Sequence, residues 1–545
     1  MASQGSQPGS ASPRPAGPAG GLAAGHSRPP RVRMPPRRWG LKRLTVAGGL
    51  YLLLLVGVRL WWGYEADRRL QAEVNAIRSR GEPFFPEDYD LTIPADEDAG
   101  PLIRQAIAAL PPASSLGDPA DLADLLKRGV ACDDVTRHFL AETAAARQLL
   151  RAAAERPRAA WGLRLTSPMI NVRTRWLSDT RRLAKVAVAA ALAEYAAGDD
   201  AAALATVRDA LVLARHVDDN SPLLISHLVA VACDSLATST LARMLADVEV
   251  DDAPPQPLLR RRIARVPATR AQLLELRNLL LDEAALRRGI GAAMQGERSM
   301  IWDMMDCVLR GRLSLTALAG GLGGPTVQPL GLPGRAVYEP AIQLDLQRML
   351  AFMAPFVAAG TAENWTEVRA PTLEVTNKLS LRGLTRLHSA ILLPSLDRAV
   401  QIHFRLIGER RLTATVIAMR LYELDHGRRP ETLDALVPEY LAAVPRDPFH
   451  LGGGPIGYLR DDEAPRLYCA GTNGIDENGL LVWSSPTRLD HESSDYPVVF
   501  LDGRPPQEWA DVFAEQRVLK IGPPAPPGAE RGGEESADTN GEQPE

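Results

Sequence analysis

The chain has 545 residues, of which 46% are hydrophobic and 23% are charged. This composition is typical of a globular protein, and the length allows about two to four domains, each with a sizeable core. The formal net charge is −4, so the chain is not basic overall. Because nucleic-acid binding needs a basic surface that neutralises phosphates, we expect no nucleic-acid partner.

The cysteines are widely separated, at Cys132, Cys233, Cys307 and Cys469. This spacing excludes a C-x-x-C zinc or redox motif. The thiols either form long-range disulfides in an oxidising compartment or stay buried and free, since an unpaired cysteine packs like a small hydrophobic residue.

The N-terminal region predicts a tail followed by a membrane anchor. Residues 1–40 are rich in Pro, Gly, Ser and Ala and contain no acidic residue, so we expect a disordered cytoplasmic tail. Residues 41–62 contain an apolar run with a flanking Trp pair, and they reach roughly the 20 residues that a bilayer needs. Every charged residue before position 44 is positive. The positive-inside rule therefore places the N-terminus in the cytoplasm, and with a single span most of the chain lies outside the membrane.

The same residues allow other interpretations of this region. A cleaved signal peptide needs small residues after the apolar run, where this chain has Trp61 and Trp62. The pair Arg37-Arg38 resembles a twin-arginine export signal, but Gly40 stands where that signal has an aromatic residue. Translation from Met34 would give a shorter tail of ordinary length.

Residues 63–410 predict an extracytoplasmic α-helical domain. A charged helix over 65–80 should end at Gly81-Glu82-Pro83, because Gly and Pro stop helices. Two further helices should meet at Gly198-Asp199-Asp200, forming a hairpin that resembles a tetratricopeptide repeat. No second copy follows at a fixed period, so we expect an α-helical bundle rather than a repeat array. The Asp pair should cap the second helix of the hairpin.

The Gly/Pro-rich stretch 317–340 predicts a long loop, with helix returning at 340–358 and from 392. Its glycines form neither a dinucleotide-binding motif nor a P-loop. The nine histidines contain no H-E-x-x-H pattern, and His216 and His227, beside a helix turn, are expected to be core or surface residues. No nucleophile elbow is present. The sequence thus gives no positive case for an enzyme, although a site built from scattered residues, with 317–340 as its lid, stays open.

Residues 411–512 change from helical signals to a helix followed by short β-like runs. The helix should end at Asp425-His426-Gly427, a short helix should follow over 431–436, and a turn should close at Asp447-Pro448-Phe449. In this order the motifs resemble the head of the major pseudopilins of type II secretion, which implies a small α+β module. This chain lacks that family's short leader and its Phe-Thr-Leu-Ile-Glu helix start, so we do not expect it to be processed and polymerised.

The loop 471–479 resembles the calcium-binding loop of the same family. The resemblance implies Asp476, Asn478 and Asp495 as calcium ligands, and calcium prefers such oxygen donors. The alternative is a solvated hairpin loop without an ion, since Asn-Gly and Asp-rich turns arise for backbone reasons alone. No other cofactor is expected.

The whole layout, with Arg80-Gly81-Glu82-Pro83 after the anchor, resembles uncharacterised membrane-anchored proteins of planctomycete-type bacteria. The Pro/Gly-rich, acidic residues 513–545 should be disordered. We therefore expect a mainly α, non-enzymatic protein that interacts with protein partners in the cell envelope. The alternatives are an accessory component of a type II secretion or pilus-like system, and an enzyme with an unrecognised site.

Overall fold

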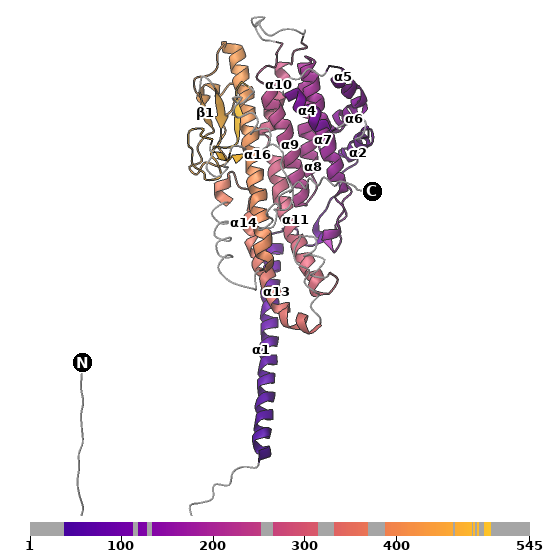
Figure 1. Cartoon of the computed structure of the whole chain (residues 1–545), viewed down its shortest axis with the longest axis vertical. Helices are drawn as coiled ribbons and strands as arrows, with labels where there is room; N and C mark the ends of the chain where they lie inside the picture. Colours follow the sequence, from indigo (N-terminus) through magenta and orange to yellow (C-terminus); the bar gives the residue numbers. More distant parts are fainter. Residues whose placement is uncertain are drawn as a thin grey trace, which may run out of the picture. The chain divides into compact units, whose positions relative to one another are not determined.

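The computed structural model describes residues 37–112, 118–127, 133–251, 265–313, 332–368, 387–460, 464–481, 483–485, 488–489 and 495–502 (Figure 1). Contacts divide the chain into two compact units, residues 1–61 and residues 62–545. The expected tails, 1–40 and 513–545, lie outside the described residues except for positions 37–40, which are helical.

Helix α1 runs over Arg37–Ser79. Its residues 37–61 are the described part of the first unit, and the rest of the helix belongs to the second unit. The predicted apolar helix over 41–62 is therefore confirmed. Its apolar stretch is long enough to cross a membrane, and none of that stretch is buried. Helix α9, Leu224–Met244, is also long and apolar enough, but it is 61% buried, as in the core helix of a soluble protein.

The second unit is mainly helical in its described residues, which confirms the predicted fold class at that level. Its further helices are η1 Pro86–Asp88, α2 Gly100–Ala108, α4 Pro119–Lys127, α5 Asp133–Glu142, α6 Ala144–Ala154, η2 Met169–Asn171, α7 Arg175–Ala196, α8 Asp200–Asp218, α9, α10 Arg270–Leu281, α11 Ala284–Leu309, α13 Leu332–Phe352, α14 Ala354–Ala358, α16 Leu387–His426 and η3 Leu433–Leu436.

Helices α7, α8 and α9 form the centre of the helical part (Figure 1). The buried face of α7 is rich in alanine, which enters helices at low cost and allows close approach of backbones. The predicted hairpin of α7 and α8 is confirmed: Gly198 adopts a positive φ of 85° at its turn, a conformation that glycine tolerates well. Asp199 caps α8 by accepting a hydrogen bond from the Ala202 amide at 2.9 Å, as expected.

Helix α16 joins the helical part to the C-terminal module, which we define as residues 411–502 of the described chain. The helix passes without a break through residues 410 and 411, and it packs against α9 and α10 as well as β2 and β5. It ends at His426, before Gly427 with a φ of 68°, as the sequence predicts.

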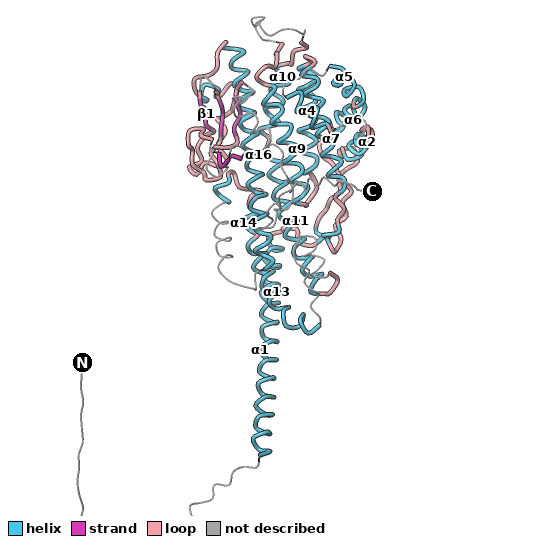
Figure 2. The backbone as a smooth tube through the Cα atoms, viewed as in Figure 1, coloured by secondary structure: helices cyan, strands magenta, loops and turns pink. Residues whose placement is uncertain are grey.

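The strands of the module are short and antiparallel (Figure 2). Strands β1 Gly457–Leu459, β2 Arg466–Tyr468 and β5 Val498–Phe500 form a sheet in the order β1-β2-β5. Strands β3 Trp483–Ser485 and β4 Arg488–Leu489 pair separately. The short helix expected over 431–436 is a 3-10 helix limited to η3.

The prediction of a loop over 317–340 is wrong for residues 332–340. Residues 317–331 lie outside the described residues, but α13 begins at Leu332 and contains Pro340. Proline fixes φ near the helical value and removes one backbone donor, so a single Pro within a helix costs a hydrogen bond without excluding the helix. The helix expected over 340–358 is interrupted at Met353, between α13 and α14.

Candidate functional site

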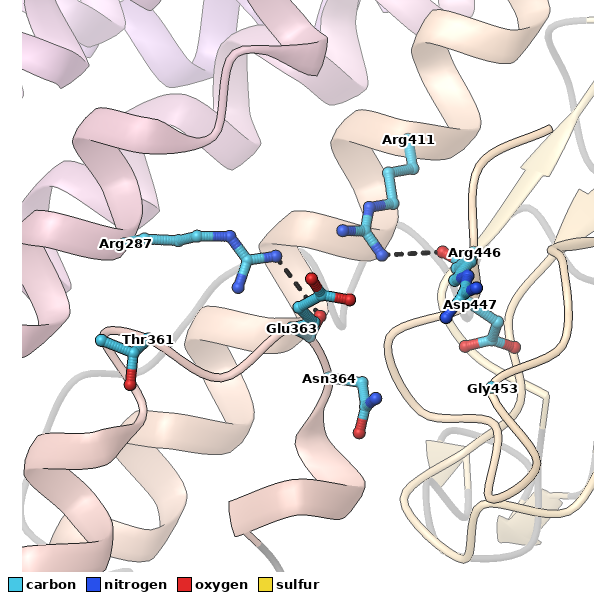
Figure 3. A pocket seen from close by; sticks show the side chains of 8 residues that line it. All are labelled: Arg287, Thr361, Glu363, Asn364, Arg411, Arg446, Asp447 and Gly453. Carbon is cyan, nitrogen blue, oxygen red and sulfur yellow. Dashed lines mark hydrogen bonds between the residues drawn. The ribbon is translucent and has the colours of Figure 1, made fainter. Parts of the chain in front are cut away.

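A polar cavity of about 430 Å³ lies where the helical part meets the C-terminal module (Figure 3). Four separate chain segments provide its walls: α11, the residues after α14, α16, and the loop that precedes β1. Its lining residues are Arg287, Thr361, Glu363, Asn364, Arg411, Arg446, Asp447 and Gly453.

One wall of the cavity is fixed by Glu283, the residue that precedes α11. Its carboxylate accepts two hydrogen bonds from Arg411, at 2.7 and 2.9 Å, and one from Arg287 at 2.7 Å. Paired hydrogen bonds between a guanidinium and a carboxylate are among the stronger and more directional contacts in proteins. The two arginines are thereby held in place, and Arg287 also donates to the carbonyl oxygens of Ala362 and Glu363.

The opposite wall is the turn Asp447-Pro448-Phe449, which the sequence predicted. The buried Asp447 carboxylate accepts hydrogen bonds from the Phe449 amide at 2.8 Å and from the Ala470 amide at 2.6 Å. It thus connects the turn to the residues that follow β2. Burial raises the pKa of Asp447 to about 6, because desolvation disfavours the charged carboxylate. Arg411 completes this wall by donating to the Arg446 carbonyl oxygen at 2.8 Å.

Two charged side chains of opposite sign at the cavity form no contact that stabilises the described fold. The Arg446 guanidinium and the Glu363 carboxylate have no hydrogen bond or ion pair with any residue in the part of the chain that the structure describes. Both residues are exposed. Figure 3 shows Glu363 with Asn364 on one side of the cavity and Arg446 with Asp447 on the other. The cavity therefore offers one donor cation and one acceptor anion to solvent.

The predicted calcium ligands lie in and beside the loop 471–479. Asp495 is fully buried, and its carboxylate accepts hydrogen bonds from the amides of Glu477 at 3.0 Å and Gly479 at 2.7 Å. Asp476 is exposed and accepts from the Asn478 amide at 2.8 Å, while Asn478 itself has a positive φ of 61°. Burial raises the pKa of Asp495, and the neighbouring Glu477 carboxyl raises it further.

The backbone amides of this loop thus occupy oxygens that the resemblance assigns to calcium. Across the described ranges of the chain, no group of at least three His, Cys, Asp or Glu side chains is placed to hold a metal ion. Calcium binding by Asp476, Asn478 and Asp495 stays a prediction.

A buried chain of hydrogen bonds crosses the helical part. Asp218, at the end of α8, accepts from His227 Nδ1 at 2.9 Å, and His227 Nε2 lies 3.2 Å from His403 Nδ1 on α16. Because a carboxylate only accepts, His227 donates from Nδ1, and one of the two facing histidine nitrogens donates to the other. All three side chains are buried, so the chain connects α8, α9 and α16 away from solvent.

The sequence left His216 and His227 as core or surface residues and did not indicate their partners. His216 and His227 are both buried, as a core interpretation predicts. Cys233, Cys307 and Cys469 are buried free thiols, which fits one of the two interpretations, whereas Cys132 lies outside the described residues.

The arginines of the cavity were also missed. Arg287, Arg411 and Arg446 belong to no local motif, and only their arrangement in space distinguishes them from the many other arginines of the chain.

Comparison with protein families, with curated proteins and with solved structures found no match to this chain.

Proposed function

We propose that this chain is a membrane-anchored scaffold of the bacterial cell envelope that presents its C-terminal module to other proteins outside the cytoplasmic membrane. It acts by binding and not by catalysis. In this proposal residues 41–62 cross the inner membrane once, with the N-terminus in the cytoplasm. The unburied apolar stretch of α1 and the positive residues before it support this part of the proposal.

The observation that carries the binding role is a group of exposed apolar side chains on the module. Leu451 and Ile475 are exposed by 58% and 55%. The loops that carry Leu451 and Ile475 lie side by side, since the Leu451 amide donates to the Gly474 carbonyl oxygen at 3.0 Å. Exposed apolar side chains that gather in one place are typical of surfaces that contact other proteins.

The attachment of the module suits a scaffold, because the module is held firmly by the helical part. Asp425 at the end of α16 receives two hydrogen bonds from Arg270 of α10. Arg277 of α10 donates to the Tyr440 carbonyl oxygen, and Arg411 pairs with Glu283, the residue that precedes α11. A rigid mount keeps the exposed loops in one orientation relative to the helices that carry them.

The second candidate function is an accessory role in a type II secretion or pilus-like system. What supports it is the antiparallel sheet β1-β2-β5 beside the long helix α16, which is the arrangement that the pseudopilin resemblance implies. Copurification with the other proteins of a secretion system would favour this role over that of an independent scaffold.

Site-specific photo-crosslinking in cells tests the proposal. A photoreactive amino acid placed at position 451 or 475 should give discrete crosslinked products with envelope proteins. The same amino acid at position 135, where Val135 of α5 is 60% exposed, serves as the matched control. Equal crosslinking from all three positions, or none from the module, would contradict the binding role. A reporter fused to the C-terminus that is active only in the cytoplasm would contradict the proposed topology.

A further inference from the structure

We propose that the cavity between the helical part and the module binds a small zwitterion that carries a primary ammonium and a carboxylate, as in a free amino acid or a short peptide. This inference is independent of the protein-binding role, because it concerns a different surface. It rests on the size of the cavity and on the two charged groups that the fold leaves unused.

The size and the walls of the cavity suit a small ligand. Its volume of about 430 Å³ falls within the range of roughly 300–1,000 Å³ that is common for small-molecule sites. The walls are preorganised, because Glu283 holds Arg287 and Arg411, and the backbone amides of Phe449 and Ala470 hold Asp447. The residues around the two binding groups are therefore already fixed, whereas Arg446 and Glu363 themselves have no partner in the described fold and lose side-chain freedom when the ligand binds.

The charges decide the class of ligand. Arg287 and Arg411 already donate hydrogen bonds to Glu283, and Asp447 already accepts two amide hydrogen bonds. What remains is the Arg446 guanidinium on one side and the Glu363 carboxylate on the other (Figure 3). A simple anion would pair with Arg446 alone, and a simple cation would pair with Glu363 alone. A ligand with both charges satisfies both groups.

In the bound state the ligand carboxylate accepts from Arg446, and the ligand ammonium donates to Glu363. Thr361 and Asn364 line the same wall, where the Thr361 hydroxyl already donates to the Ala358 carbonyl oxygen and the Asn364 amide already bonds to Glu367. Binding involves no covalent step. Because Glu363 and Arg446 are exposed, a ligand reaches both from solvent.

Thermal melting of the full chain in detergent provides the test. The probes are an equimolar mixture of the twenty amino acids and a random dipeptide mixture, each at about 10 mM. Because a ligand that binds only the folded state stabilises it, we expect at least one mixture to raise the melting midpoint by a few degrees. The two mixtures distinguish a free amino acid from a peptide. No rise with either mixture would overturn the proposal.

Blocked probes test the two charges separately. N-acetylated probes lack the ammonium and C-amidated probes lack the carboxylate, and we expect neither to raise the midpoint. If the acetylated probes still stabilise the chain, the site is an anion site and the zwitterion proposal is wrong. If the amidated probes still do so, the site takes cations and the proposal is equally wrong.

Substitutions locate the site. Arg446→Gln and Glu363→Gln should each weaken binding about tenfold or more, because each removes a charge-assisted hydrogen bond to the ligand. Neither group has a partner in the described fold, so both variants should melt near the parent midpoint without ligand. Arg428→Gln and Glu439→Gln change exposed residues of the same module that do not line the cavity. Equal losses in these controls would place the ligand elsewhere.

Discussion

The carboxylate of Glu82 lies 2.6 Å from the guanidinium of Arg298, in an ion pair that connects the segment after α1 to α11. Arg298 is fully buried, and its Nε and one terminal nitrogen have no hydrogen-bond partner among the described residues. Glu82 is therefore the charge that compensates a buried cation. This gives a physical role to Glu82 within the Arg80-Gly81-Glu82-Pro83 stretch.

Removing Glu82 should destabilise the fold. Glu82→Gln leaves a buried charge without compensation, and the expected loss is about 3 kcal/mol in the free energy of unfolding. Denaturant titration of the full chain in detergent measures it. Arg80→Gln is the matched control, because Arg80 also pairs with Glu82 but is about half exposed, so its expected loss is below about 1 kcal/mol. The double variant Glu82→Gln with Arg298→Met should lose less than Glu82→Gln alone, and a larger loss would contradict this account.

Gly289 of α11 should not tolerate alanine, although alanine favours helices. A Cβ at position 289 would overlap the buried Asp218 carboxylate, which holds His227. Overpacking of this kind costs about 1–3 kcal/mol, against a helix-propensity gain of at most about 1 kcal/mol. We therefore expect a lower melting midpoint for Gly289→Ala. In Gly291→Ala of the same helix, the nearest atom would be the Gly360 Cα at 3.4 Å, and we expect a midpoint near that of the parent.

The buried histidines should make the fold sensitive to acid. Burial lowers the pKa of His216 to about 4, and burial also lowers the pKa of His403 well below 6.5, helped by the nearby His227 and Arg287. Below about pH 6.5 the unfolded chain binds protons at these residues and the folded chain does not, so stability falls as the pH drops from about 6.5 to about 4.

His216→Gln should flatten this pH dependence. The shift at His216 corresponds to on the order of 3 kcal/mol, so the variant should lose about that much less than the parent between pH 6.5 and pH 4. Denaturant midpoints across this range provide the measurement. The exposed His138→Gln variant is the control and should follow the parent. A parallel pH profile for His216→Gln would show that this histidine is not the acid-sensitive group.

Asp495 should stabilise the loop 471–479 with or without calcium. Asp495→Ala removes the acceptor of two backbone amides, and the expected loss is about 2–3 kcal/mol even with a chelator present. The resemblance predicts in addition a rise of the parent midpoint in millimolar calcium that magnesium does not give, and that Asp476→Asn reduces. A parent that melts identically in calcium and in chelator would exclude calcium binding there.

The sequence by itself determined where several helices end. Gly81, Gly198 and Gly427 follow helices as predicted, because a glycine at a helix end adopts positive φ for reasons that are local to the chain. The apolar stretch of α1 and the alanine-rich hairpin were likewise predictable from composition over a few turns. The failure at Pro340 shows the limit of such local signals, since α13 includes a proline that composition assigned to a loop.

Only the tertiary structure decided which charged residues meet. The ion pair between Glu82 and Arg298 joins residues that are far apart in the chain. The hydrogen bonds of Asp218, His227 and His403 do the same. The cavity likewise brings Arg446 and Glu363 together from separate segments. These contacts depend on how helices pack, and no periodicity or motif records them. Among the residues that line the cavity, the sequence indicated only Asp447, which belongs to the predicted turn Asp447-Pro448-Phe449. Its arginines became recognisable once α11, α16 and the loop before β1 were brought together.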